Sequence, residues 1–240
     1  MDRDEQHNQE YFNAHLHEYS SKRIKGVARA ISEVTSSPIS SICDVGSGTG
    51  SNVQKLADRL HIERRVAFDV SEKSLQKVSE RFSNIEVKQL SILSKEDVAD
   101  FENQFDVVLL AAVLHHLVGK NPAHSSIHAR EGLINALSLV KPGGLLVVLE
   151  PVFKPQWAMK ILFYVKKLLT SISKERISLF GYWNNIGAPL VMMYSKEQVQ
   201  GFIKGLNSAQ LRVEKHHDAQ LGWIRMLVKK EDAMFVIQKD

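Results

Sequence analysis

The stretch Ile42-Cys43-Asp44-Val45-Gly46-Ser47-Gly48-Thr49-Gly50 decides the fold of this chain. Its apolar beginning predicts a short buried strand. Glycines then alternate with other residues, and a glycine lets the backbone take positive φ angles and approach a ligand closely. Apolar residues at helical spacing follow, at Val53, Leu56, Ala57 and Leu60. A strand, a glycine turn and a helix predict a nucleotide-binding α/β unit, because the helix begins with free N–H groups.

Composition limits the class of protein. The chain has 240 residues, of which 44% are hydrophobic and 24% charged, as in an ordinary globular protein. The net charge of +4 is too small to predict a nucleic-acid partner. Cys43 is the single cysteine, so no disulfide framework is expected. No apolar run approaches the roughly 18 residues of a membrane span, and the polar N-terminus lacks a signal core. We therefore expect a cytoplasmic protein.

Apolar runs and helical patterns alternate after the glycine stretch. Further strands are expected at residues 65–70, 85–90, 105–110, 145–150, 210–215 and 233–237. The alternation up to residue 150 predicts an α/β fold with a doubly wound parallel sheet. We expect one domain over residues 1–240, with four parts: a helical cover at 1–37, a cofactor-binding core at 38–151, an insertion at 152–194 and the end of the sheet at 195–240.

Asp69 ends the second expected strand and lies 19 positions beyond Gly50. An acid about 20 residues after the glycines is typical of sites that hold the hydroxyls of a ribose. One carboxylate can accept hydrogen bonds from both vicinal hydroxyls of an adenosine. Asp69 is therefore the predicted ribose ligand.

The glycine spacing separates two classes of nucleotide-binding enzyme. Dehydrogenases prefer Gly-x-Gly-x-x-Gly, whereas this chain has Gly-x-Gly-x-Gly after Asp44. In this respect the chain resembles the class I S-adenosylmethionine-dependent methyltransferases, in particular their small-molecule branch of type 11 and 12. Four motifs carry the resemblance in the family's order over residues 39–151, namely residues 44–50, Phe68-Asp69-Val70-Ser71, residues 105–117 with the pair His115-His116, and Lys141-Pro142-Gly143-Gly144-Leu145.

The resemblance implies a Rossmann-like sheet of seven strands, S-adenosylmethionine as cofactor and S-adenosylhomocysteine as product. The glycines would lie under the methionine part of the cofactor, Asp69 would hold the ribose, and Val70, Ser91 and Ile92 would surround the adenine. The residues implied in cofactor binding are Tyr19, Asp44, Gly46, Ser47, Gly48, Gly50, Asp69, Val70, Ser91, Ile92, Ala111 and Ala112. Tyr19 could equally belong to the packing of the first helix.

Four histidines gather at His115, His116, His124 and His128. An imidazole can remove a proton from an acceptor as methyl transfer proceeds, so His115 and His116 are the candidate catalytic residues. The alternative is that the pair packs beneath the methionine side of the site. No metal is expected, because the acids that usually complete a metal site are not interleaved with these histidines.

Residues 155–175 predict a basic amphipathic helix. Its apolar arc comprises Trp157, Ile161, Tyr164, Val165, Leu168, Leu169 and Ile172. The opposite arc holds Lys160, Lys166, Lys167 and Lys174, with Met159 and Phe163 among them. Such a helix could be a lid over an apolar pocket, which we favour, or could contact an anionic membrane surface. The predicted substrate contacts are Trp157, Ile161, Tyr164, Tyr182, Trp183 and Tyr194.

Together these features predict methyl transfer from S-adenosylmethionine to oxygen or carbon of a small acceptor that is apolar, aromatic or lipid-like. Two alternatives remain open from the sequence. One is an NAD-dependent oxidoreductase, and the other is a binding module that keeps the methyltransferase fold without catalysis.

Overall fold

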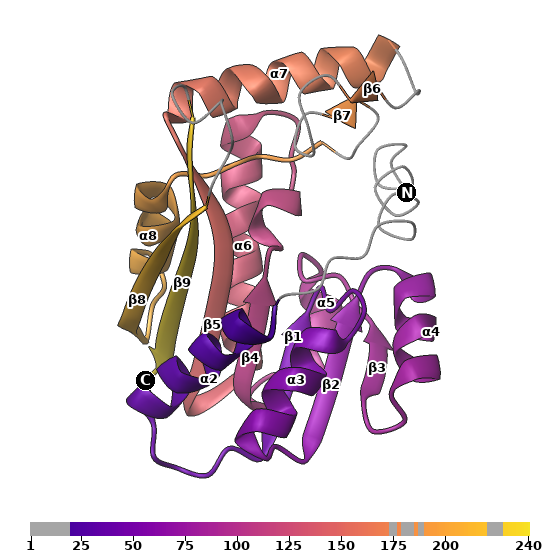
Figure 1. Cartoon of the computed structure of the whole chain (residues 1–240), viewed down its shortest axis with the longest axis vertical. Coiled ribbons are helices and arrows are strands. Elements are labelled where there is room, and N and C mark those ends of the chain that lie inside the picture. Colours follow the sequence, from indigo (N-terminus) through magenta and orange to yellow (C-terminus); the bar gives the residue numbers. More distant parts are fainter. Residues whose placement is uncertain (1–19, 173–176, 179–184, 187–189, 220–227) are drawn as a thin grey trace.

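A seven-stranded sheet with the order β3-β2-β1-β4-β5-β9-β8 forms the centre of the protein (Figure 1). The computed structural model describes residues 20–172, 177–178, 185–186, 190–219 and 228–240. The strands are β1 Ser41–Val45, β2 Arg64–Asp69, β3 Glu86–Gln89, β4 Phe105–Ala111, β5 Val140–Lys154, β8 Ala209–Ala219 and β9 Lys229–Lys239. A separate pair, β6 Ile177–Ser178 and β7 Asn185–Ile186, belongs to the insertion.

The first five strands are parallel, and the last two are antiparallel to their neighbours. β1 pairs with β2 and β4, and β4 pairs with β5, all in parallel register. β9 lies between β5 and β8 and is antiparallel to both. The predicted Rossmann-like sheet of seven strands is therefore confirmed.

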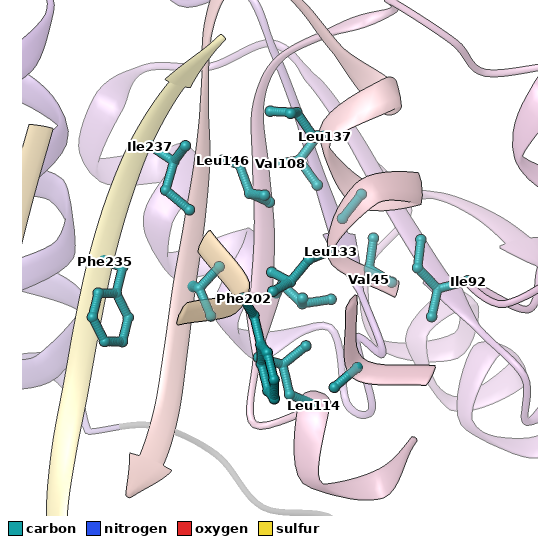
Figure 2. Close-up of a cluster of buried hydrophobic side chains, with 14 of the residues drawn as sticks. Val45, Ile92, Val108, Leu114, Leu133, Leu137, Leu146, Phe202, Phe235 and Ile237 are labelled. Carbon is teal, nitrogen blue, oxygen red and sulfur yellow. The ribbon is translucent and has the colours of Figure 1, made fainter. Parts of the chain in front are cut away.

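Helices cover both faces of the sheet (Figure 1). They are α2 Ser21–Val34, α3 Ser51–Leu60, α4 Glu72–Arg81, α5 Lys95–Ala99, α6 Pro122–Leu139, α7 Gln156–Ile172 and α8 Lys196–Lys204, with a short 3-10 helix, η1 Leu114–His116. Side chains of α2, α3 and α4 form one apolar core against the sheet. Those of α6 and α8 form a second core on the other face, where Leu133 and Phe202 meet Val108 and Leu146 (Figure 2).

Local sequence explains where several helices begin. Ser71, Ser94 and Ser195 have extended backbones, and each side chain accepts a hydrogen bond from an amide three residues later. Ser195 and Gln198 form a complete capping box. These caps fix the start of α4, α5 and α8 where the chain leaves the sheet or an ordered loop.

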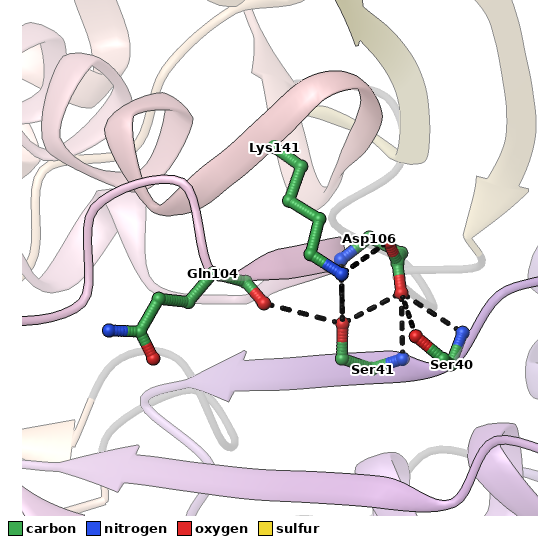
Figure 3. Close-up of polar contacts among 5 residues, drawn as sticks. All are labelled: Ser40, Ser41, Gln104, Asp106 and Lys141. Carbon is green, nitrogen blue, oxygen red and sulfur yellow. Dashed lines mark hydrogen bonds and ion pairs between the residues drawn. The ribbon is translucent and has the colours of Figure 1, made fainter.

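Asp106 joins β1, β4 and β5 near their amino ends (Figure 3). The glycine loop follows the carboxyl end of β1, at the opposite end of these strands. Its Oδ2 accepts hydrogen bonds from the Ser40 and Ser41 hydroxyls, both at 2.7 Å, and its Oδ1 lies 2.8 Å from Lys141 Nζ. Partial burial alone would raise the pKa of Asp106. The hydrogen bonds from Lys141, Ser40 and Ser41 outweigh burial and hold that pKa well below its ordinary range.

We expect Asp106→Asn to lower the free energy of unfolding by about 1–2 kcal/mol at neutral pH, because a charge-assisted network with partial solvent screening is lost. A lowered pKa stabilises the fold above the unfolded value of about 4, and this contribution disappears as the pH falls below it. Urea unfolding at about pH 7 and about pH 3 should therefore show a difference that shrinks in acid. Asp58→Asn is a surface control, with a paired carboxylate 55% exposed. An equal loss in both variants would contradict the role of Asp106.

Candidate active site

The glycine loop between β1 and α3 is fixed to the neighbouring strand β2. The amides of Gly46 and Ser47 donate to the Phe68 carbonyl oxygen at 2.8 and 3.0 Å. Gly46 has a φ of +69°, and a Cβ on it would lie 2.7 Å from Cγ2 of Val113. Only glycine therefore fits this position without moving Val113, which comes from the loop after β4.

Asp69 closes the other side of this loop. Its Oδ2 accepts from the Gly48 amide and its Oδ1 from the Ser71 amide, both at 2.9 Å. Burial raises the pKa of Asp69, and the amides of Ser71 and Gly48 oppose that rise. The carboxylate is thus held in place at the end of β2, and each oxygen retains capacity to accept a further hydrogen bond, as ribose hydroxyls require.

Asp44 is the buried acid of the glycine stretch. Its side chain is 1% exposed, and among the described residues neither carboxylate oxygen has a hydrogen-bond partner. Burial, and then the charge of Asp69, raises the pKa of Asp44 to about 8, and the Val53 amide, too poorly placed for a hydrogen bond, opposes this rise only in part. An unsatisfied buried carboxyl costs stability unless a ligand satisfies it. The site therefore suits a ligand that brings a cationic donor to Asp44.

The predicted adenine residues lie at the ends of β2 and β3. Val70 follows Asp69 and is 47% exposed, whereas Ile92 is buried. The Ser91 amide donates to Asp97 Oδ2 at 3.0 Å, and Asn135 Nδ2 donates to the Ile92 carbonyl at 2.7 Å. Asp97 was missed by the sequence reasoning, because its proximity to Ser91 depends on the turn into α5.

Ala111 ends β4 and Ala112 follows it, beside the glycine loop. Ala112 has a φ of +58°, unusual for a residue other than glycine, and its amide donates to the Leu149 carbonyl at 2.7 Å. Such backbone conformations cost free energy and concentrate at functional sites. Here the bend directs the chain from β4 into η1, which carries both candidate histidines.

His115 forms a buried pair with Glu150, the residue after the last β5 position that pairs with β4. His115 Nδ1 lies 2.5 Å from Glu150 Oε1, and the His115 amide donates to the same oxygen at 3.2 Å. Glu150 is 0% exposed, and its Oε2 has no hydrogen-bond partner among the described residues. In the sequence Glu150 is only the acid that ends an apolar run, and its burial beside His115 depends on the fold.

Burial changes the titration of both members of this pair. It raises the pKa of Glu150 to about 8. Burial, and then the charges of Lys230 and Lys166, lowers the pKa of His115 to about 3. The pair thus favours a net neutral state at low and neutral pH, because a buried net charge is costly.

The other histidines lie near this pair or at the start of α6. The rings of His115 and His116 have centroids 4.0 Å apart, and His128 Nδ1 is 3.2 Å from the Val118 carbonyl oxygen. Within the described part of the chain, no group of three His, Cys, Asp or Glu residues could hold a metal ion. A catalytic role for His116 stays a prediction.

The orientation of α7 is opposite to the one predicted. Trp157, Ile161 and Tyr164 are 66%, 55% and 54% exposed, so the expected inner arc faces solvent. Met159 and Phe163 are buried instead, as is Lys166, which was expected on the solvated arc. The interpretation of the predicted apolar arc as the inner surface of a lid is therefore wrong, because residues of the opposite arc pack on the sheet.

The remaining predicted contacts divide into a buried residue and residues without a described position. Tyr194 is fully buried, with its ring packed on Phe202 at a centroid distance of 5.2 Å, so it belongs to the core. Burial, and then the charge of Glu150, raises the pKa of Tyr194. Tyr19, Tyr182 and Trp183 lie outside the described residues.

Comparison with known proteins now gives the class. Residues 43–146 match a family described as a methyltransferase domain. Over 132 residues the chain is 28% identical to the hybrid PKS-NRPS synthetase apdA of Emericella nidulans, covering 52% of this chain and 3% of that much longer protein.

Solved structures share the fold. The N-methyltransferase NodS from Bradyrhizobium japonicum, in complex with S-adenosylhomocysteine, superposes with a TM-score of 0.57 at 16% identity, covering 91% of this chain and 86% of that one. The CurJ carbon methyltransferase also gives 0.57, at 17% identity, covering 91% of this chain and 53% of that one.

Residues 43–146 are thus similar to a methyltransferase domain, and the strand order with the glycine loop gives the chain the class I methyltransferase fold. The cofactor pair is therefore S-adenosylmethionine and S-adenosylhomocysteine, and the residues fit it. Among the described residues Asp44 lacks a cationic partner, and each carboxylate oxygen of Asp69 can accept a further hydrogen bond. The match to a methyltransferase domain favours this cofactor over the NAD of an oxidoreductase.

We expect S-adenosylhomocysteine to bind more weakly as the pH falls below about 8. Below its pKa of about 8, Asp44 is protonated in the free protein. The ammonium group of the ligand stays protonated up to about pH 7.7–8 and stabilises the ionised form of Asp44. Binding then releases a proton, so affinity should fall by up to about tenfold for each pH unit below about 7.5. Calorimetry across this range, repeated in buffers of different ionisation enthalpy, measures both effects. Asp44→Asn should bind weakly and without this pH dependence. Pronounced pH dependence that persists in Asp44→Asn would contradict the assignment.

Proposed function

We propose that the chain methylates a carbon or oxygen atom of a small, largely apolar acceptor, and that the His115–Glu150 pair takes the proton which this atom loses. The observation that carries the proposal is the buried contact between these two side chains. His115 follows the carboxyl end of β4, and Glu150 lies where β5 extends beyond β4; the glycine loop lies at the same end of β1, which pairs with β4. Ligands of open α/β sheets bind along this edge.

The chemistry requires a nucleophile on the acceptor and a place for its proton. Bound S-adenosylmethionine supplies a methyl group on a sulfonium sulfur, which departs as the neutral thioether of S-adenosylhomocysteine when the acceptor's electron pair takes the methyl. Carbon acids, phenols and alcohols become good nucleophiles only when they lose a proton. An amine with a free lone pair attacks without a base, so a buried base favours carbon or oxygen acceptors.

The His115–Glu150 pair can hold this proton. As the pH rises through about 8, the raised pKa of Glu150, the pair acquires one net negative charge. The carboxylate then accepts the Nδ1–H of His115, and Nε2 presents a lone pair to the acceptor. When Nε2 takes the proton, the pair becomes net neutral, which is the state that burial favours. A base oriented by a carboxylate follows the logic of catalytic triads.

The surroundings of the pair support an apolar acceptor with one negatively polarised oxygen. Phe163 on the inner face of α7 is buried in one cluster with Met192, whose amide donates to the His115 carbonyl oxygen at 2.9 Å, and Met159 is buried against Phe153 of β5. Lys166 lies on the same inner face, where burial lowers its pKa to about 8. Its charge influences His115, so it would also favour negative charge that develops on an enolate or phenolate oxygen.

One of the similar structures supports a carbon acceptor in particular, because CurJ is a carbon methyltransferase. NodS, an N-methyltransferase, shows that the fold also serves amine acceptors. The His115–Glu150 pair, rather than the fold, is the reason to prefer an acceptor that must lose a proton.

The test measures formation of S-adenosylhomocysteine with three kinds of acceptor: a β-keto thioester as carbon acid, an alkylphenol, and a primary amine of similar size. We expect turnover of the carbon acid or the phenol, with a rate that rises to a plateau above about pH 8. Turnover of the amine alone, or full activity of His115→Asn with the acidic acceptors, would overturn the proposal. Binding of S-adenosylhomocysteine by that variant confirms that its cofactor site is intact.

A further inference from the structure

The outer face of α7 carries a continuous apolar stripe. The α7 stripe consists of Trp157, Ile161, Tyr164, Val165 and Leu168, which are 66%, 55%, 54%, 45% and 62% exposed. At about 100° and 1.5 Å per residue these positions share an arc of about 100° and extend over roughly 16 Å of the helix. The helix lies across one end of the molecule, at the top of the view in Figure 1.

Rotation of α7 could not bury the α7 stripe in the core of the protein. The opposite face of α7 is already packed, with Met159 and Phe163 only 2% and 1% exposed. The other exposed large apolar side chains in the described part of the chain are dispersed over several elements, namely Val70, Ile127, Ile134 and Leu211. Single exposed apolar residues are ordinary, whereas a contiguous patch marks an interaction surface.

Positive charge borders this stripe. The 17 residues of α7 include three lysines and no acid. Lys160 and Lys167 lie along one edge of the stripe, roughly 40–60° from Tyr164 on the helical projection. Lys167 Nζ donates to the Lys120 carbonyl at 2.7 Å, which brings the exposed Lys120 to the same border.

We propose that the α7 stripe seats the protein on an anionic phospholipid surface. Trp and Tyr are preferred at the level of lipid headgroups, and aliphatic side chains insert next to them. The positive charges of Lys120, Lys160 and Lys167 are complementary to anionic headgroups. α7 carries no acidic residue that the headgroups would repel. No helix of the described chain is long and apolar enough to cross a bilayer, so the contact is peripheral. This inference does not depend on the acceptor proposed above.

The test is co-sedimentation of the full chain with phosphatidylcholine vesicles, with and without phosphatidylserine. We expect binding to the anionic vesicles that weakens with added salt, and little binding to phosphatidylcholine alone. A triple variant, Trp157→Ser, Ile161→Ser and Leu168→Ser, should lose at least about tenfold in vesicle affinity. Lys160→Glu with Lys167→Glu should reduce binding to the anionic vesicles selectively.

Ile127→Ser with Ile134→Ser provides a matched control, because these α6 residues are 48% and 52% exposed but lie outside the stripe. The control should bind vesicles like the wild type. Thermal unfolding and S-adenosylhomocysteine binding verify that each variant is folded. If the triple variant does not fold, the single variant Trp157→Ser replaces it in the test. Absence of wild-type vesicle binding, or an equal loss in the α6 control, would overturn the proposal. Self-association of the wild type that the triple variant abolishes, without vesicle binding, would assign the stripe to a second copy instead.

Discussion

Gly46→Ala is expected to weaken S-adenosylhomocysteine binding by at least about a hundredfold, equivalent to about 2.7 kcal/mol. Two effects combine at this position. The φ of +69° is unfavourable for alanine, and its Cβ would lie 2.7 Å from Val113 Cγ2. Relief of that contact would displace the loop that positions Asp69 through Gly48. Calorimetric titration of the purified variant measures the loss.

Gly143→Ala separates backbone strain from the effect on the site. Gly143 has a similar φ of +76°, but a Cβ there meets nothing within 4 Å. This variant should lose about 1 kcal/mol of stability and retain wild-type affinity for S-adenosylhomocysteine. If both variants lost affinity for S-adenosylhomocysteine to the same degree, the glycine loop would not be the part of the chain that contacts the cofactor.

Glu150→Gln is expected to reduce kcat/KM by about 10²–10⁴-fold with the acceptor that the wild type methylates. The neutral amide has no negative charge to stabilise His115 once its Nε2 has taken the proton. The pH–rate profile should also lose its inflection near pH 8, which arises from the raised pKa of Glu150. Binding of S-adenosylhomocysteine should stay unchanged. Steady-state kinetics between about pH 6 and 9 measure the loss and the change of profile together.

Two controls match the members of the pair. Glu197→Gln removes a carboxylate that is 56% exposed and paired with Lys154, and His124→Asn removes an exposed histidine at the start of α6. Neither should change kcat/KM appreciably. A Glu150→Gln enzyme that keeps the wild-type rate and pH profile would show that the pair has only a structural role.

The sheet and the cofactor half of the site were predictable because their signals are local. A parallel strand buried on both faces is a run of apolar residues, as in β4, and the glycine loop must be contiguous in sequence. The acid after the next strand follows from the same βαβ unit. These features led to β1, β2 and Asp69 without knowledge of any distant contact.

The acceptor half was less predictable because it depends on contacts distant in sequence. His115 and Glu150 are 35 positions apart, and only the register of β4 against β5 brings them together. For α7, helical periodicity defined two arcs but not which one packs on the sheet, because both arcs contain large apolar residues. Phe163 is buried in the core with residues of the sheet, and Lys166 is also buried, which the hydrophobicity of the helix did not reveal.

The two ends of the insertion meet at one place on β5. Beyond Leu149, β5 no longer pairs with β4 and pairs only with β9. The chain returns to β5 at Tyr194, which forms a parallel bridge with Val152 and accepts a hydrogen bond from the Phe153 amide at 2.9 Å. Segments whose ends lie close together can be exchanged without disturbing the scaffold. Residues 155–193 are therefore expected to be replaceable as a unit while Glu150 and the glycine loop stay in place. If α7 acts as proposed above, such a replacement would change the attachment of the protein to membranes without changing its cofactor site.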